Sequence, residues 1–206
     1  MSTIIKCSRY AGLAVGFAVL AGVLAIPLAG RAQSVAAKET TMQVRRSLER
    51  LPYYGVFDFL AYSVDRGKVT LQGSVYNGAT KTGAEMALKR VSGVDEVVNR
   101  IEVLPASPDD ERIRWDTFFR LYTDDFLSRY APGGPMAARY ALQDFARFPG
   151  MQPLGTYAIH IVVKNRRVTL VGVVDNESDK TLAGFRAREV PGTFGVDNEL
   201  MVASKK

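Results

Sequence analysis

The stretches "KVTLQGSV" (Lys68–Val75) and "RVTLVGVV" (Arg167–Val174) carry nearly the same pattern twice. The spacing of 99 residues that relates them holds without a gap from Val69 to Val103, and it aligns 14 identical residues in 35 positions. Unrelated stretches of average composition would share about two. The sequence therefore contains a duplicated domain.

Each copy has the same order of predicted elements. Apolar residues recur at helical spacing, alternate in two runs around a short turn, return to helical spacing and end in a third alternating run. In the first copy these segments are 44–51, 56–64, 65–67, 69–75, 84–91 and 97–103, and in the second they are 138–145, 157–163, 164–166, 168–174, 178–190 and 196–202. The predicted fold class is α+β, with two tandem αββαβ modules and an extra aromatic helix between them. Each module would place two helices on one face of a three-stranded mixed sheet.

The motifs shared by the copies resemble a known family. They are V-T-L-x-G-x-V, a lysine-bearing helix with an early alanine, and V-S/P-G-x-x-x-V-x-N-x-I/L-x-V. This ordered set resembles the BON domain, named for bacterial osmotic-stress and nodulation proteins. The resemblance implies a bacterial envelope module that binds phospholipid membranes or other envelope components without catalysis. Together with an N-terminal leader pattern, the two copies divide the chain into a leader (1–32), a first domain (38–104), an inter-repeat helical segment (105–134) and a second domain (135–203).

The leader has the features of a secretory signal peptide. Lys6 and Arg9 precede an uncharged run from Ala11 to Gly30, and small residues flank Arg31 before a cleavage site after Ala32. This pattern predicts export to the periplasm, with the protein peripheral to the envelope. The run is also long enough to span a bilayer, so an uncleaved anchor is the alternative.

Charge and cysteine content exclude several classes of function. Of the formal net charge of +6, three charges lie in the leader, together with Cys7, the single cysteine. The remaining chain is too weakly basic to indicate nucleic acid as a partner. It also offers no disulfide or thiol nucleophile.

The sequence also lacks a recognisable set of catalytic residues. His160 is the single histidine, which leaves no metal cluster and no triad or dyad. We expect no enzymatic activity, no metal and no cofactor.

The segment between the copies carries an aromatic stripe. Trp115, Phe118, Phe119, Tyr122 and Phe126 recur at helical spacing. The stripe predicts a helix that packs on one or both repeats. The alternative is a face for a membrane interface or a partner, with Trp115 and Phe119 as candidates.

The outward face of the second sheet is predicted to be unusually apolar. Thr169, Val171 and Val173 stand where the first copy has Thr70, Gln72 and Ser74, and the neighbouring strand adds Ala158, His160 and Val162. Such a face is expected to be covered. The candidates for the cover are the inter-repeat segment, the first repeat, a protein partner and a second copy of the chain.

Basic residues gather at the predicted hairpin turns and at one helix position. They are Arg66, Lys68, Lys164, Arg166, Arg167, Lys81 and Lys180. Cations at loop tips can contact lipid headgroups or polyanionic envelope polymers, although most are solvated surface. The leading hypothesis is therefore attachment to a phospholipid membrane or another anionic envelope component. The alternative is a structural or protein-interaction module that uses the apolar outer face of the second sheet.

Overall fold

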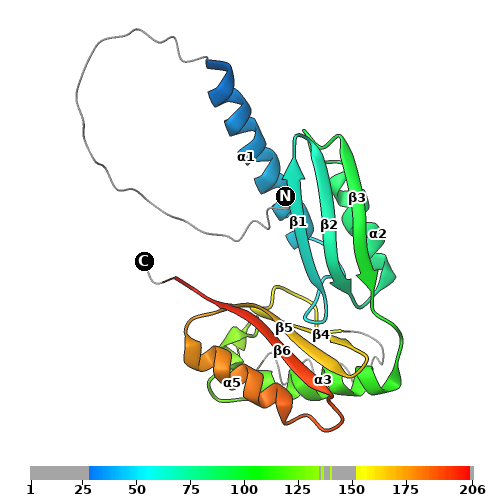
Figure 1. Ribbon diagram of the computed structural model, residues 1–206, viewed down its shortest axis with the longest axis vertical. Helices are drawn as coiled ribbons and strands as arrows, with labels where there is room; N and C mark the ends of the chain where they lie inside the picture. Colours follow the sequence, from blue (N-terminus) through cyan, green and yellow to red (C-terminus); the bar gives the residue numbers. More distant parts are fainter. Residues whose placement is uncertain (1–27, 135, 137–139, 141–151, 205–206) are drawn as a thin grey trace, which may run out of the picture.

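A computed structural model describes residues 28–134, 136, 140 and 152–204. The elements are α1 (Leu28–Glu49), β1 (Phe59–Asp65), β2 (Lys68–Val75), α2 (Gly78–Leu88), β3 (Glu96–Val103), α3 (Pro108–Tyr122), a 3-10 turn η1 (Ser128–Tyr130), β4 (Ile159–Lys164), β5 (Arg167–Val174), α5 (Glu177–Arg188) and β6 (Gly195–Val202). They form two modules, one on β1–β3 and one on β4–β6 (Figure 1). The predicted α+β class with two repeated modules is confirmed.

The two sheets have the same topology. In each, the first two strands form an antiparallel hairpin and the third pairs in parallel with the second. Alternate residues of the central strands, Val69 and Leu71 in β2 and Val168 and Leu170 in β5, are fully buried. Because successive strand residues point to opposite faces, this alternation leaves one face of each sheet for a layer of helices.

In the first module the helix layer is formed by α1 and α2, which pack against each other. Val44 and Leu48 of α1 and Ala84 and Leu88 of α2 lie in one core with the strands. Asn77, whose side chain accepts from the Ala79 N–H, caps α2 where the strand pattern breaks.

In the second module α3 and α5 form the corresponding layer (Figure 1). Phe118 and Tyr122 of α3 are fully buried in the same core as β4, β5 and α5. The helix predicted between the modules is therefore part of the second module, because its aromatic stripe completes that core. The helix predicted at 138–145 lies, apart from residue 140, outside the described residues.

Two duplicated glycines are explained by close packing of the hairpin strands. Gly73 and Gly172 have φ of 120° and 141°, and a Cβ at either would collide with a backbone carbonyl oxygen, of Phe59 or Ala158. Only glycine adopts this conformation without strain.

The duplicated asparagines of the last strands are structural. Nδ2 of Asn99 donates to the carbonyl of Lys81 at 3.1 Å, and Nδ2 of Asn198 donates to the carbonyl of Lys180 at 2.7 Å. Each bond ties a strand to the helix above it. The shared lysines thus mark a position whose backbone carbonyl is used in both modules.

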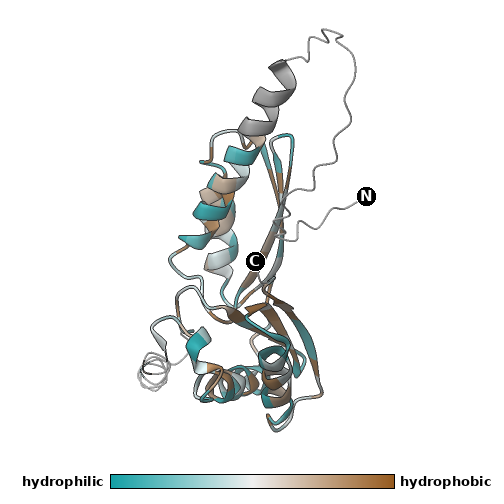
Figure 2. Cartoon of the chain, turned by 90° about the vertical axis from the view of Figure 1, so that its left-hand side faces the viewer, coloured by the Kyte–Doolittle hydropathy of each residue, from teal (hydrophilic) through white to brown (hydrophobic). Residues whose placement is uncertain are grey.

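Figure 2 shows apolar residues concentrated along the strands of the second module and polar stretches on α1. Across the described ranges, no helix combines the length and apolar character that a bilayer crossing requires. The predicted leader falls mostly outside those ranges, so cleavage and export remain predictions.

Candidate functional site

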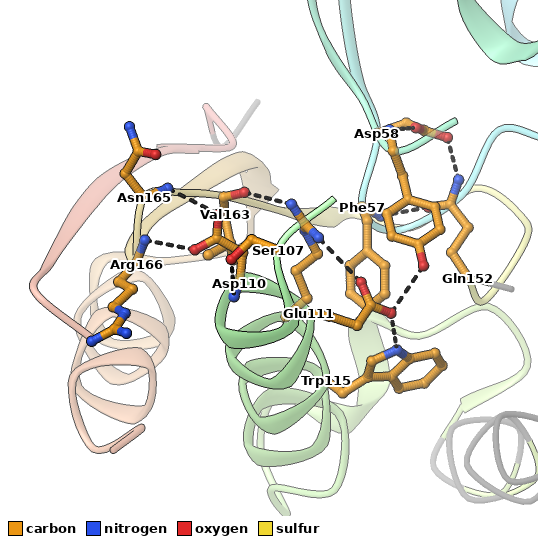
Figure 3. A network of polar contacts seen from close by, with 12 residues as sticks. Phe57, Asp58, Ser107, Asp110, Glu111, Trp115, Gln152, Val163, Asn165 and Arg166 are labelled. Carbon is orange, nitrogen blue, oxygen red and sulfur yellow. Dashed lines mark hydrogen bonds and ion pairs between the residues drawn. The ribbon is translucent and has the colours of Figure 1, made fainter. Parts of the chain in front are cut away.

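The second hairpin turn is bound to the start of α3. The backbone N–H groups of Asn165 and Arg166 donate to Oδ2 and Oδ1 of Asp110, at 3.0 and 2.7 Å. Asp110 is almost fully buried, and Ser107 caps the same helix end (Figure 3). From the sequence alone, acidic residues at a helix start indicate only a favourable interaction with the helix dipole. Its use as a clamp on a turn 55 residues away was not predicted.

All three cations of this turn form ion pairs within the chain. Lys164 contacts Glu102 at the end of β3 at 2.5 Å, and Arg167 makes two bonds to Asp197 at 3.0 and 3.1 Å. Arg166 pairs with Asp109, and its guanidinium lies 5.2 Å from the centre of the Phe194 ring. Their positive charge is therefore largely compensated, although each side chain remains partly exposed.

The first hairpin turn projects freely by comparison. The Arg66 side chain is 91% exposed and contacts only its neighbour Asp65 among the described residues, at 3.3 Å. Lys68 pairs with Glu96 at 2.8 Å. Lys81 and Lys180, also candidates for anion contact, lie half-buried on α2 and α5, away from both turns. The structure thus does not gather the predicted cations into one site.

The outer face of the second sheet is covered on one side only. His160 on β4 is buried by the segment that precedes β1, and its ring centre lies 5.4 Å from that of Tyr54. The Ile161 N–H donates to the carbonyl of Val56 at 2.8 Å, which joins this segment to the edge of β4. Val173 and its pairing partner Met201 both remain 44% exposed.

Of the remaining candidates for the partner face, some are buried and others are partly exposed. Thr169 and Val171 lie half-buried on that outer face. Trp115 is buried in the core, whereas Phe119, four residues later, is half exposed. The predicted aromatic stripe is therefore mainly core, and Phe119 stands at its outer margin.

A buried polar network joins the two modules, and the sequence did not predict it. Glu111 Oε1 accepts from the Tyr76 hydroxyl and from Nε1 of Trp115, both at 2.9 Å. Glu111 Oε2 accepts from Nη1 of Arg114, whose Nη2 donates to the carbonyl of Val163 at 2.8 Å. Figure 3 shows Glu111 at the centre of these contacts. Because Tyr76 follows β2 and Val163 lies in β4, α3 links one sheet to the other.

A fully buried carboxylate, that of Asp58, lies at the same junction. It accepts from the backbone N–H groups of Tyr76 at 2.7 Å and Gly55 at 3.0 Å, and from Nε2 of Gln152 at 2.6 Å. Burial raises the pKa of Asp58 to about 6, and the hydrogen bonds oppose part of that rise. Burial also lowers the pKa of the neighbouring His160 to about 4.

The helices of the first module carry a concentration of positive charge. We call residues 37–50 and 78–90 the basic helix layer. It contains seven cations (Lys38, Arg45, Arg46, Arg50, Lys81, Lys89, Arg90) against three carboxylates (Glu39, Glu49, Glu85), a net charge of +4. The equivalent ranges of the second module, 108–122 and 177–190, hold six cations and seven carboxylates. Counting charge by predicted helix would have revealed this difference in the sequence.

Two apolar side chains project from the basic helix layer. Met42 on α1 is 44% exposed and Met86 on α2 is 51% exposed. Arg46, Arg50 and Arg90 are exposed in the same layer and form no ion pair within the part of the chain that the structure describes. The layer therefore combines uncompensated cations with flexible apolar groups.

No metal centre is present among the described residues, where no three His, Cys, Asp or Glu side chains are arranged to hold an ion. The two-module fold, with the carboxylates of Asp58 and Asp110 used in structural bonds, defines a class of small proteins built from tandem α+β modules. The BON domain family matches residues 37–105 and 146–204, more than half of the chain. The chain therefore belongs to the BON domain family and carries two copies, in a family of non-catalytic binding domains.

Two solved structures from Chlamydia trachomatis resemble the chain. The first, CdsD, a structural protein of the type III secretion system, is 13% identical, with 81% of this chain and 94% of that chain covered and a TM-score of 0.26. The second, the C-terminal domain of CdsD, is 13% identical, with 79% and 96% covered and a TM-score of 0.24. These values are too low to indicate function. No curated protein matches the chain significantly.

Proposed function

We propose that the chain is a non-catalytic binding protein of the bacterial cell envelope that attaches to anionic phospholipid surfaces through the basic helix layer. The observation that carries this proposal is the net charge of +4 on that layer, beside a nearly neutral second module. Each cation near an anionic membrane surface contributes about 1 kcal/mol. The layer is exposed, since the sheet lies on its other side.

Met42 and Met86 support contact with a membrane rather than with a soluble anion. Both are exposed among the cations of the basic helix layer. Methionine is flexible and apolar, so it can enter the boundary between headgroups and acyl chains without a shaped pocket. Export to the periplasm, where such a surface is available, belongs to the same proposal.

The hairpin turns are weaker sites for lipid than the sequence suggested. The cations of the second turn are paired with Glu102, Asp109 and Asp197. Those of the first turn stand beside Asp65 and Glu96. An anionic surface would have to compete with these carboxylates.

Liposome co-sedimentation tests the proposal. Arg46→Ser combined with Arg90→Ser removes two exposed cations of the layer. This variant should bind anionic vesicles about 30-fold more weakly, because each lost cation contributes about 1 kcal/mol. The matched control is Arg100→Ser combined with Arg188→Ser, which removes the same charge from exposed positions elsewhere.

Binding should require anionic lipid and should fall as salt rises, since exposed charges are screened. Equal weakening in the test and control variants would refute a localised site. A loss of binding only in Lys164→Ser combined with Arg167→Ser would place the site on the second hairpin turn instead.

A second candidate function is protein interaction through the outer face of the second sheet. Val173 and Met201 lie opposite each other on β5 and β6 and are both exposed. A protein partner or a second copy of the chain held there would resist salt, because apolar contacts are not screened. The measurement is sedimentation of the protein without vesicles in high salt, for Val173→Ser and for the unmodified protein. Association that persists in the unmodified protein and is lost in Val173→Ser distinguishes this function from lipid binding.

A further inference from the structure

The two hairpin turns have the same backbone geometry. In the first, Asp65 pairs with Lys68 across two residues of positive φ, Arg66 at 46° and Gly67 at 82°. In the second, Lys164 pairs with Arg167 across Asn165 at 52° and Arg166 at 61°. Such two-residue turns direct the N–H groups of their central residues away from the hairpin, so these groups require an acceptor outside it.

The second turn shows which acceptor suits this geometry. Both oxygens of the Asp110 carboxylate are used, one on each of two successive N–H groups, at 2.7 and 3.0 Å. The guanidinium of Arg166 pairs with Asp109, the residue that precedes Asp110 in α3. A planar carboxylate with two acceptor atoms matches two adjacent donors, and charge-assisted bonds of this kind are stronger than neutral ones.

The first turn has no equivalent acceptor among the described residues. Within the described ranges, the backbone N–H groups of Arg66 and Gly67 donate to no backbone carbonyl outside the strands. Arg66 itself extends into solvent. The stretch at 36–38 of α1 is Ala-Ala-Lys, so it offers no carboxylate of the kind that Asp109 and Asp110 provide at the start of α3.

We propose that the first hairpin turn is a binding site for a carboxylate on an acidic segment of a partner protein, which it receives as the second turn receives Asp110. The N–H groups of Arg66 and Gly67 would bind the carboxylate. The Arg66 side chain, at the first central position of the turn where the second module has Asn165, would pair with an adjacent acidic residue of the partner, an ion pair that Arg166 makes with Asp109 from the second central position. This site is separate from the basic helix layer and does not depend on lipid binding.

The surroundings of the turn favour a protein carboxylate over a phospholipid. Asp65 and Glu96 already pair with the two cations of the turn, and the Asp95 carboxylate occupies the space that a Cβ on Gly67 would need. This local negative charge would repel a densely anionic membrane surface. Two neighbouring carboxylates, one bound directly by the two N–H groups and one paired with Arg66, bring far less negative charge than a membrane surface and match the pair Asp110 and Asp109 at the second turn.

The test is an amide NMR titration of the chain from Gln33 onward with a blocked peptide of the sequence PASPDDE, which copies residues 105–111. The resonances of Arg66 and Gly67 should shift and saturate, with a dissociation constant on the order of 1 mM for so small a contact. The resonances of Asn165 and Arg166 are the internal control, because Asp110 already occupies them. The matched peptide PASPNNE should bind about tenfold more weakly.

Two variants extend the test. Arg66→Ala should weaken binding about fivefold through loss of the ion pair, and Asp95→Asn should tighten it about threefold through loss of repulsion. No shift at Arg66 and Gly67 up to about 10 mM peptide would overturn the proposal. So would equal shifts with the asparagine peptide, or shifts at these amides with anionic vesicles but not with the acidic peptide.

Discussion

The carboxylate of Asp58 accepts a hydrogen bond from Nε2 of Gln152 at 2.6 Å, across 94 residues of sequence. Asp58 precedes β1 of the first module, and Gln152 lies on the approach to β4 of the second. The same Asp58 accepts from the N–H of Tyr76, which follows β2. One buried side chain thus holds three segments at the place where the two modules meet.

Asp58 and His160 should have opposite effects on the pH dependence of stability. The folded-state pKa of Asp58, about 6, exceeds its ordinary value of 3.8, so between these values the folded state binds a proton that the unfolded state lacks. Its contribution to stability therefore falls as pH rises. The folded-state pKa of His160, about 4, lies below the ordinary 6.5, so its contribution rises with pH.

In the unmodified protein the two contributions should nearly cancel between pH 4.5 and 6. In His160→Gln, the free energy of unfolding should fall by about 2 kcal/mol over that range, and in Asp58→Asn it should rise by a similar amount. Urea denaturation at both pH values measures this. Slopes of the same sign in the two variants would contradict the assignment.

Arg114 should be essential to the junction. It is 2% exposed, and it bonds Glu111 on one side and the carbonyl of Val163 on the other. Arg114→Met leaves the half-buried Glu111 carboxylate without its cation and the buried Val163 carbonyl without a donor, so the free energy of unfolding should drop by about 1–3 kcal/mol.

The control for Arg114 is Arg112→Met on the same helix. Arg112 is about half exposed in its pair with Asp116, and such pairs contribute less than about 1 kcal/mol. Thermal denaturation compares the two variants. Similar losses would show that the network adds no stability of its own.

Asp110 should stabilise the second hairpin turn. Asp110→Ala removes the acceptor of two backbone N–H groups, and a loss of about 2–3 kcal/mol is expected. Asp109→Ala removes only the partly exposed pair with Arg166 and should cost less than about 1 kcal/mol. Hydrogen exchange at Asn165 and Arg166 should quicken in the first variant and stay nearly unchanged in the second.

The duplicated strand glycines should not tolerate a side chain. Gly73→Ala or Gly172→Ala places a Cβ against a backbone carbonyl at strongly positive φ, so each should destabilise its module by more than about 3 kcal/mol. Gly78→Ala, at the start of α2, meets open space and should be neutral or slightly stabilising. Circular dichroism during urea denaturation distinguishes these outcomes.

The order of strands and helices in each module could be predicted from the sequence because it depends on local patterns. Alternation through Val69 and Leu71 marks a strand with one buried face, and Asp65-Arg66-Gly67 marks its turn. The spacing of 99 residues then predicts the same strands and turn in the second copy. The basic helix layer could also have been found, since it requires only a count of charge over two predicted helices.

Which helix completes the second core, by contrast, was decided by the tertiary structure. The spacing of Trp115, Phe118 and Tyr122 predicts an apolar stripe but does not specify the sheet that it covers. The clamp of Asp110 on Asn165 and Arg166, and the bond from Gln152 to Asp58, join residues 55 to 94 positions apart. The reason is physical: a residue's helical or strand pattern is set by its neighbours in the chain, whereas a buried carboxylate binds whichever donors the packing brings within hydrogen-bond distance.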